Sequence, residues 1–242
     1  MPKIPKLIGS LIKTTWSKMF ITALVIEKQQ LTVDLLKIRF QANLQDATYK
    51  VGQAILIQIS ATEYRNYTPS VFNKSEGYFD VIFHQAAEGP GTTFFKQINI
   101  GETIITSLPR GRSIYNSKAN YHFFYGDDTC IGICEALQEI IKKDQGKLIG
   151  ILELDPLSIS YAYQNLKHID FINPPDYNAI SPALDYLSNI DEYTWNKYTK
   201  GHFYLMGNGK SIQQFRKALR EKGIPSENIT TQPFWVKGKI GL

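Results

Sequence analysis

The hydrophobic period of the chain changes near Gly111, and this change limits the fold more than any other feature. Before it, short β-branched and aromatic runs alternate with turn signals such as Val51-Gly52 and Asn99-Ile100-Gly101. After it, apolar strands alternate with amphipathic helices, which is the pattern of an open α/β sheet. With 242 residues, the chain is long enough for one unit of each kind.

The first region is predicted to contain only short strands and one helical turn. The predicted strands are Phe20–Glu27, Thr32–Phe40, Ala54–Ser60, Tyr67–Phe72, Tyr78–Gln85 and Thr103–Ser107. The helical turn is predicted at Gly91–Gln97, directly after Gly89-Pro90-Gly91. Strands of this length and spacing favour a small antiparallel β-barrel.

The second region is predicted to be a doubly wound parallel sheet. The predicted strands are Tyr121–Tyr125, Leu148–Leu154, Ile169–Ile172 and His202–Gly207, and the predicted helices are Thr129–Lys143, Pro182–Tyr198 and Ser211–Lys222. Strands that are apolar throughout are typical of a parallel sheet covered on both faces. We therefore expect a barrel domain over 19–112 and an α/β domain over 113–242.

The N-terminal segment has apolar residues at helical spacing. Ile4, Leu7, Leu11 and Thr15 recur three or four positions apart, which predicts an amphipathic helix over 1–18 that packs on the domain behind it. A basic helix on an anionic membrane surface is the alternative. The longest uncharged run, Val51–Thr62, is shorter than the roughly 18 residues of a membrane-spanning helix.

Composition excludes several classes of protein. Apolar residues make up 43% of the chain, which is enough for a core and argues against disorder. The net charge of +5 is spread along the chain without a recognition motif, so a nucleic-acid partner is not expected. Two cysteines cannot build a disulfide scaffold, so a reducing, cytoplasmic location is expected. No metal site is expected either, because metal-ligand spacing is absent among His84, His122, His168 and His202.

The segment Arg65-Asn66-Tyr67-Thr68-Pro69-Ser70 carries the clearest chemical signal. On an extended strand, Arg65 and Tyr67 face one side about 7 Å apart, and Thr68 faces the other. A guanidinium can hold a phosphate through two parallel bonds, and a phenol ring can stack on a flat ligand. An exposed arginine beside a packed tyrosine has the same pattern, so this segment alone leaves both interpretations open.

The segment Gly89-Pro90-Gly91-Thr92-Thr93 suits an anion at the start of a helix. The first amides of a helix have no partner within it, and they can bind phosphate oxygens. An ordinary turn with a helix cap fits the same residues. In one barrel with Arg65, however, the segment favours a ligand that is aromatic at one end and phosphorylated at the other.

The order of the motifs resembles the siderophore-interacting protein family, the flavin-dependent ferric-siderophore reductase branch of the ferredoxin–NADP⁺ reductase superfamily. The resemblance spans Phe20 to Gly238. It is carried by Arg65-x-Tyr67-Thr68, a strand ending in His84, Gly89-Pro90-Gly91, Leu108-Pro109-Arg110-Gly111, Tyr125-Gly126-Asp127-Asp128-Thr129, Gly207-Asn208-Gly209 and Phe234-Trp235.

This resemblance implies an FAD-binding barrel and an α/β domain that faces the electron donor. By matching position, Arg65 would hold the FAD phosphates, Tyr67 would stack on the isoalloxazine and Thr68 would approach its reactive edge. The other implied cofactor residues are His84 beside the flavin and Gly91, Thr92 and Thr93 around the pyrophosphate. The implied donor-facing residues are Gly126, Asp127, Asp128 and Thr129.

The implied activity is electron transfer from NAD(P)H or ferredoxin through FAD to a ferric siderophore, with no obligatory acid–base side chain. Lys237 and Lys239 are candidates to attract an anionic chelate, although a solvated basic tail fits them as well. A general NAD(P)H–flavodoxin or ferredoxin reductase and a non-catalytic flavin- or siderophore-binding module are the alternatives.

Three positions depart from the family pattern. Ser70 stands where members often have a second arginine, Asp128 replaces the usual glutamate, and Gly132 lies near a common proline. These departures concern the donor and the substrate more than the flavin.

Overall fold

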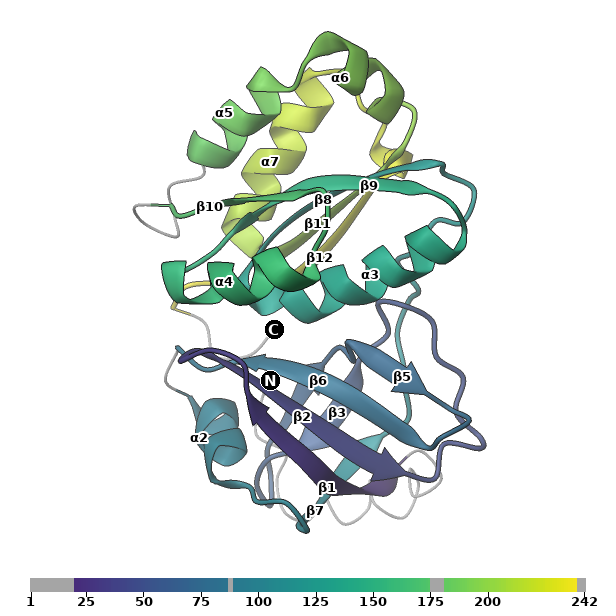
Figure 1. Cartoon of the computed structure of the whole chain (residues 1–242), viewed down its shortest axis with the longest axis vertical. Helices are drawn as coiled ribbons and strands as arrows, with labels where there is room; N and C mark the ends of the chain where they lie inside the picture. Colours follow the sequence, from purple (N-terminus) through teal and green to yellow (C-terminus); the bar gives the residue numbers. More distant parts are fainter. Residues whose placement is uncertain (1–19, 87–88, 175–180, 239–242) are drawn as a thin grey trace. The chain divides into compact units, whose positions relative to one another are not determined.

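The computed structural model describes residues 20–86, 89–174 and 181–238. They fall into two compact units, one ending at Ser113 and the other starting at Ile114 (Figure 1). The helix predicted over 1–18 lies outside the described residues. None of the helices in the described ranges combines the length and the apolar character needed to cross a bilayer.

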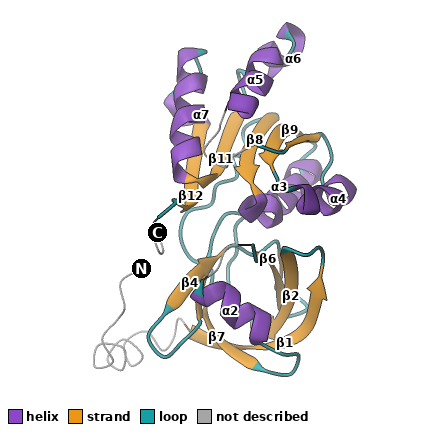
Figure 2. Cartoon of the chain, turned by 90° about the vertical axis from the view of Figure 1, so that its left-hand side faces the viewer, coloured by secondary structure: helices purple, strands orange, loops and turns teal. Residues whose placement is uncertain are grey.

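The first unit is a seven-stranded antiparallel sheet with one helix, α2 (Pro90–Gln97). Its strands are β1 (Phe20–Gln30), β2 (Leu35–Ala42), β3 (Ile55–Gln58), β4 (Tyr64–Tyr67), β5 (Val71–Asn73), β6 (Tyr78–His84) and β7 (Thr103–Ser107). They pair in the order β4-β3-β7-β1-β2-β6-β5, and Figure 2 shows the sheet curving into a barrel. The expected antiparallel barrel is confirmed.

Alternation of side chains along the strands builds the barrel core. On β6, Phe79, Val81 and Phe83 are buried in the core cluster, whereas His84 is only half-buried. Because neighbouring side chains on a strand point to opposite faces, the core set occupies every second position. Asp80 lies on the other face of β6 and is also fully buried, which is unusual for a carboxylate.

The strand predicted at Tyr67–Phe72 is wrong, because it is two strands. β4 ends at Tyr67 and β5 begins at Val71, with Thr68, Pro69 and Ser70 between them. Pro69 has no N–H group to continue the ladder. Its carbonyl oxygen instead accepts a hydrogen bond from Tyr49 Oη at 2.9 Å. The three residues between the strands, Thr68 to Ser70, therefore do not continue the strand that carries Arg65 and Tyr67.

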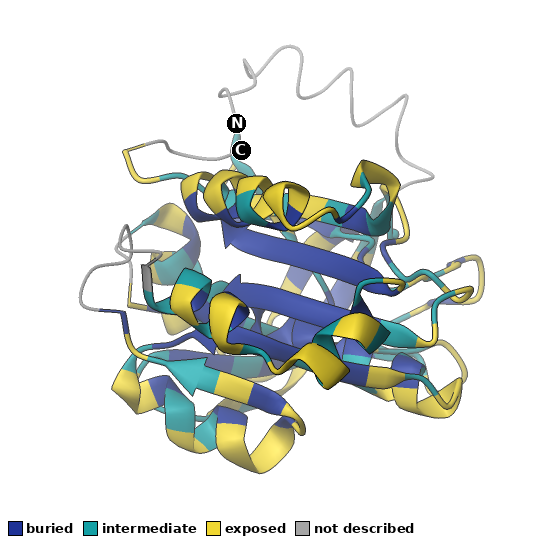
Figure 3. Cartoon of the chain, turned by 90° about the horizontal axis from the view of Figure 1, so that it is seen from above, coloured by how far each residue is buried: buried dark blue, intermediate teal, exposed yellow. Residues whose placement is uncertain are grey.

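The second unit is a five-stranded parallel sheet, in the order β10-β9-β8-β11-β12. Its strands are β8 (Tyr121–Asp127), β9 (Lys147–Glu153), β10 (Ile169–Ile172), β11 (His202–Asn208) and β12 (Ile229–Trp235). Its helices are α3 (Ile131–Lys143), α4 (Pro156–Asn165), α5 (Ser181–Asn189), α6 (Glu192–Tyr198) and α7 (Gly209–Glu221). α3 and α4 cover one face, and α5, α6 and α7 cover the other, which confirms the doubly wound fold (Figure 1). The covered strands are buried, and the helices expose their outer sides (Figure 3).

Two predictions for this unit need correction. The single helix predicted at Pro182–Tyr198 is two helices, because Asp191 accepts a bond from Thr194 N and starts α6 anew. α4 and β12 were not predicted. The signal for α4 is the Asp155 cap followed by Pro156 at the first helical position. Three of the seven residues of β12 are polar, so its sequence lacks the apolar run of the inner strands.

Candidate functional site

Three of the predicted site residues meet where β4 ends and α2 begins. A Cβ atom added to Gly91 would lie 2.5 Å from Tyr67 Oη and 3.8 Å from Arg65 Cγ. Arg65 and Tyr67 therefore lie on the same side of β4, as their alternate positions predict, and both reach the start of α2. Only glycine leaves room for the Tyr67 hydroxyl at this point, so the residues form a cradle that a Cβ would fill. We call Arg65, Tyr67 and Gly91 the β4–α2 cradle.

Two phenylalanines hold the Tyr67 ring in place. Its centroid lies 4.8 Å from Phe83 on β6 and 5.1 Å from Phe95 on α2, both in T-shaped arrangements. Burial raises the pKa of the Tyr67 phenol well above its usual value, although the nearby Arg65 charge opposes the shift. The hydroxyl therefore stays protonated and can donate a hydrogen bond at neutral pH.

Arg65 retains donors for a ligand. Its Nη1 donates to the Tyr64 carbonyl oxygen at 2.9 Å, and its Nη2 lies 3.8 Å from a Glu63 carboxylate oxygen. A guanidinium has five N–H donors, so these two contacts leave capacity to bind phosphate oxygens.

A groove of about 680 Å³ runs along the start of α2. It is lined by Gly89, Thr92 and Thr93 from the helix start and by Glu63 from the turn before β4. Gly89 has no side chain to cap the helix, Pro90 has no N–H group, and the Thr93 amide donates to the Gly89 carbonyl oxygen at 3.0 Å. The amides of Gly91 and Thr92 are therefore the ones that can bind an anion. Thr92 and Thr93 thus line a solvent-accessible groove at the start of α2.

His84 and Thr68 lie at strand ends in the same unit. His84 ends β6 and is half-buried, and its Nε2 atom is buried without a hydrogen-bond partner among the described residues. Thr68 follows β4 and is half-buried. An unpartnered imidazole nitrogen, a guanidinium with spare donors and the β4–α2 cradle together fit a phosphorylated ligand with a flat ring system.

Asp127 joins three strands of the second unit. One carboxylate oxygen accepts from the Thr129 amide at 3.0 Å, and the other accepts from the Asn208 amide at 2.8 Å and from Trp235 Nε1 at 2.9 Å. These bonds connect the carboxyl ends of β8, β11 and β12. Gly126 is also needed for packing, because a Cβ there would lie 2.8 Å from Cys130 Cβ. Gly126 and Asp127, two of the four predicted donor-facing residues, therefore have a structural role at this edge.

A second carboxylate lies beside Asp127, and sequence reasoning did not identify it. Glu153 ends β9, pairs in register with Asp127 and accepts a bond from Tyr125 Oη at 2.9 Å. Burial, with the neighbouring Asp127 charge, raises the pKa of Glu153 to about 7. Its sequence signal is an acidic residue at the end of an otherwise apolar strand. Asp128 is also bonded, since it accepts from the Asp155 amide at 3.1 Å.

The remaining predicted residues lie apart from these clusters. Lys237 is exposed after β12, and Lys239 lies outside the described residues. Ser70, at one of the departures from the family pattern, is buried and bonds to β6. Gly132, which also departs from the family pattern, is buried in the first turn of α3.

Comparison with family models identifies the first unit. Residues 22–115 match the model of the oxidoreductase FAD-binding domain, which covers the barrel and the β4–α2 cradle. No curated protein matches the chain in sequence.

Comparison with solved structures covers both units. A siderophore-interacting protein of Acinetobacter baumannii is 14% identical, with 91% of this chain and 92% of that chain covered and a TM-score of 0.76. A siderophore utilization protein of T. fusca is also 14% identical, with coverage of 92% and 95% and a TM-score of 0.75. The ferredoxin reductase of carbazole 1,9a-dioxygenase is 14% identical, with coverage of 89% and 69% and a TM-score of 0.72. The resemblance indicated by the motif order is thus confirmed in the fold.

Proposed function

We propose that this FAD-dependent oxidoreductase passes electrons from NAD(P)H or a ferredoxin to a ferric siderophore. The match of residues 22–115 to the oxidoreductase FAD-binding domain supports the proposal. The observation that carries the proposal is the β4–α2 cradle, in which Arg65, Tyr67 and Gly91 meet inside the matched domain. FAD supplies the redox chemistry, since it takes up a hydride or single electrons and releases electrons one at a time.

The residues of the barrel hold and orient the cofactor. The Arg65 guanidinium binds its phosphates, together with the amides of Gly91 and Thr92 and the hydroxyls of Thr92 and Thr93. Tyr67 offers its ring to the isoalloxazine, and Phe83 and Phe95 keep that ring in position. Thr68 and the Nε2 atom of His84, which has no hydrogen-bond partner among the described residues, lie at the edge of the flavin.

The electron donor is assigned to the α/β unit. Ligands of open α/β sheets bind outside the carboxyl ends of the strands, where the chain order reverses. In this sheet the reversal lies between β8 and β11, and Gly126 to Thr129 stand at that edge. Asp127 organises the edge through its bonds to β11 and β12.

The proposed substrate is an anionic ferric chelate. Two structures that share the fold are a siderophore-interacting and a siderophore utilization protein. One NAD(P)H carries two electrons, which reduce two Fe³⁺ ions to Fe²⁺ and leave NAD(P)⁺ and a proton. The lower charge of Fe²⁺ weakens its attraction to oxygen donors, so the iron is released. The exposed Lys237 contributes positive charge that favours such a chelate.

Anaerobic stopped-flow spectroscopy tests the proposal. The purified protein is loaded with FAD, reduced with NADPH, NADH or reduced ferredoxin, and mixed with a ferric hydroxamate or catecholate chelate. We expect flavin absorbance to return as two ferric ions are reduced per FAD.

The same experiment separates the alternatives. Reoxidation by flavodoxin or oxidised ferredoxin but by no chelate would make the chain a general reductase. Bound FAD that no donor reduces would make it a binding module.

A further inference from the structure

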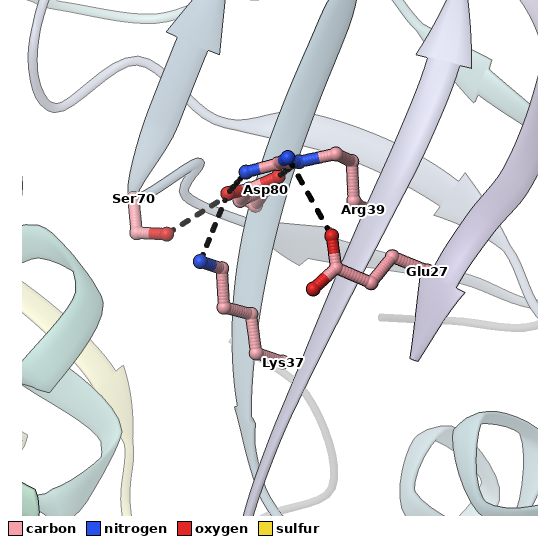
Figure 4. A network of polar contacts seen from close by, with 5 residues as sticks. All are labelled: Glu27, Lys37, Arg39, Ser70 and Asp80. Carbon is pink, nitrogen blue, oxygen red and sulfur yellow. Dashed lines mark hydrogen bonds and ion pairs between the residues drawn. The ribbon is translucent and has the colours of Figure 1, made fainter. Parts of the chain in front are cut away.

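Asp80 is the buried centre of an ion-pair network on the face of β6 that points away from the barrel core, and its partners are partly exposed. The side chain is fully buried. Arg39 on β2 binds it with two parallel bonds, Nε to Oδ1 at 2.7 Å and Nη2 to Oδ2 at 2.8 Å. Lys37 Nζ lies 3.2 Å from the same carboxylate, and Glu27 lies 3.5 Å from Arg39 (Figure 4). The Arg39 guanidinium also lies over the Tyr78 ring, 4.3 Å from its centroid.

The Arg39–Asp80 pair links β6 to β2 in the same register that the buried apolar residues of β6 require. The two residues are direct partners in the antiparallel register. A slip of one position would turn Asp80 into the apolar core and move Phe83 out of it. Since Phe83 packs against the Tyr67 ring, this alignment determines the support behind Tyr67.

The main chain of Asp80 also holds the segment that follows Tyr67. The Ser70 amide donates to the Asp80 carbonyl oxygen at 2.9 Å, and the Ser70 hydroxyl donates to the same oxygen at 3.3 Å. Ser70 lies two residues after Thr68, and β5 is an edge strand of only three residues. The position of Thr68 therefore depends on where β6 lies.

We propose that the Arg39–Asp80 pair positions the flavin-binding residues, because it fixes β6 and thereby holds Phe83 behind Tyr67 and Ser70 beside Thr68. This inference rests on the proposed binding of FAD at the β4–α2 cradle. Arg39 and Asp80 are positioning residues, since they act through Phe83 and Ser70.

The function of the Arg39–Asp80 pair is to hold β6 and β2 in a defined geometry, and not only to neutralise the Asp80 charge. Burying a carboxylate is costly, and apolar side chains stabilise a sheet as well as a buried ion pair does. A lysine can neutralise Asp80, but it cannot reproduce the planar two-bond fork of Arg39. The variant Arg39→Lys therefore keeps the neutralising charge and removes the two-bond geometry.

The test measures FAD binding by Arg39→Lys and Asp80→Asn, with Glu27→Gln as the matched control. Glu27→Gln removes an outer member of the network and leaves the Arg39–Asp80 bonds intact. Binding is followed by flavin fluorescence quenching and by the visible absorbance bands, and urea unfolding of each apoprotein is measured in parallel. We expect at least tenfold weaker FAD binding and altered flavin bands for Arg39→Lys, with an unfolding midpoint close to wild type. Glu27→Gln should bind FAD as wild type does.

The outcomes distinguish this proposal from the proposed function. If the wild-type protein does not bind FAD, the proposed function fails. If wild type binds FAD and Arg39→Lys binds it with unchanged affinity and spectrum, the positioning role is wrong. Should Asp80→Asn fail to fold, the Arg39→Lys result decides alone.

Discussion

At the scale of single residues, the β4–α2 cradle depends on the absence of one carbon atom. The Tyr67 hydroxyl occupies the space that a side chain at Gly91 would need. Phe83 and Phe95 hold the ring, so it cannot move aside without repacking the core. The packing around Tyr67 thus accounts for the glycine at the start of α2.

Gly91→Ala is expected to weaken FAD binding by at least tenfold. The added Cβ would lie 2.5 Å from Tyr67 Oη, so either the ring or the helix start must shift. Overpacking of this kind costs about 1–3 kcal/mol. Fluorescence titration with FAD measures the change in affinity.

Two further variants make this test specific. Gly89→Ala is the control, because a Cβ at Gly89 meets nothing within 4 Å and alanine has no side-chain acceptor that could occupy the amides of α2. Adding Tyr67→Phe to Gly91→Ala removes the colliding oxygen and should restore part of the affinity. Equal affinity for wild type and Gly91→Ala would contradict the cradle.

Arg65→Ala is expected to lower FAD affinity by about tenfold to 150-fold. Hydrogen bonds to a charged group contribute about 1.5–3 kcal/mol each, and 1.4 kcal/mol corresponds to a factor of ten. Isothermal titration calorimetry measures the effect, with the exposed Arg112→Ala as the control for loss of one positive charge. Unchanged affinity of Arg65→Ala would remove the phosphate assignment.

At the scale of the elements, a buried polar cluster ties the amino ends of β8 and β11 together. His122 Nδ1 lies 3.0 Å from Tyr204 Oη, and that oxygen also accepts a bond from the Asn116 amide at 3.2 Å. His202 Nε2 lies 2.8 Å from Thr230 Oγ1 on β12. Burial lowers the pKa of His122 to about 4 and also lowers the pKa of His202. Both rings are therefore neutral in the folded protein at pH 7.

Protonation of His122 is expected to lower the free energy of unfolding as the pH falls from about 6.5 to 4, and the difference between wild type and a His122 variant measures this contribution. In this range the unfolded chain binds protons on His122 that the folded protein does not, so protonation favours unfolding. The shift of the His122 pKa corresponds to a loss of up to about 3 kcal/mol. Urea unfolding followed by far-UV circular dichroism across this range measures the slope.

The difference between variants identifies the group responsible. As the pH falls, His122→Gln should lose less stability than wild type, and His168→Gln, at an exposed position, should follow wild type. Glu153 acts in the opposite direction: its raised pKa lowers stability as the pH rises from about 4.5 to 7. The two histidine variants are therefore compared at the same pH values. Equal slopes for His122→Gln and wild type would show that His122 does not control the effect.

At the scale of the whole molecule, each of the two units has a core cluster of its own among the described residues. The barrel core gathers side chains from β1 to β7 and α2, and the second core gathers them from the parallel sheet and its helices. The predicted cofactor residues belong to the first unit, and the predicted donor-facing residues belong to the second. Ligands of the two kinds should therefore stabilise different parts of the chain.

Saturating FAD is expected to slow amide hydrogen exchange most strongly in β4, β6 and α2. Ligand at a hundred times its dissociation constant stabilises the binding-competent state by about 2.7 kcal/mol, which corresponds to roughly a hundredfold slower exchange from shared openings. Mass spectrometry of peptides measures the pattern. The Arg65→Ala protein at the same FAD concentration is the control. Protection confined to β10 to β12 would place the ligand in the other unit.

The sequence by itself determined the order of the units, most of their strands and helices, and the candidate residues of the flavin site. These features depend on local period and on motifs whose members are close along the chain, as Arg65 and Tyr67 are. For the same reason, α4 could have been predicted from Asp155 and Pro156. The break at Pro69 had a local signal as well.

Only the tertiary structure decided which distant residues meet. Arg39 and Asp80 are 41 positions apart, and Asp127 and Trp235 are 108 apart. Their contacts depend on strand order and register, which arise when whole sheets assemble and not from the pattern of any one segment. The burial of Asp80 and the raised pKa of Glu153 follow from that assembly, because desolvation depends on every element that covers a group.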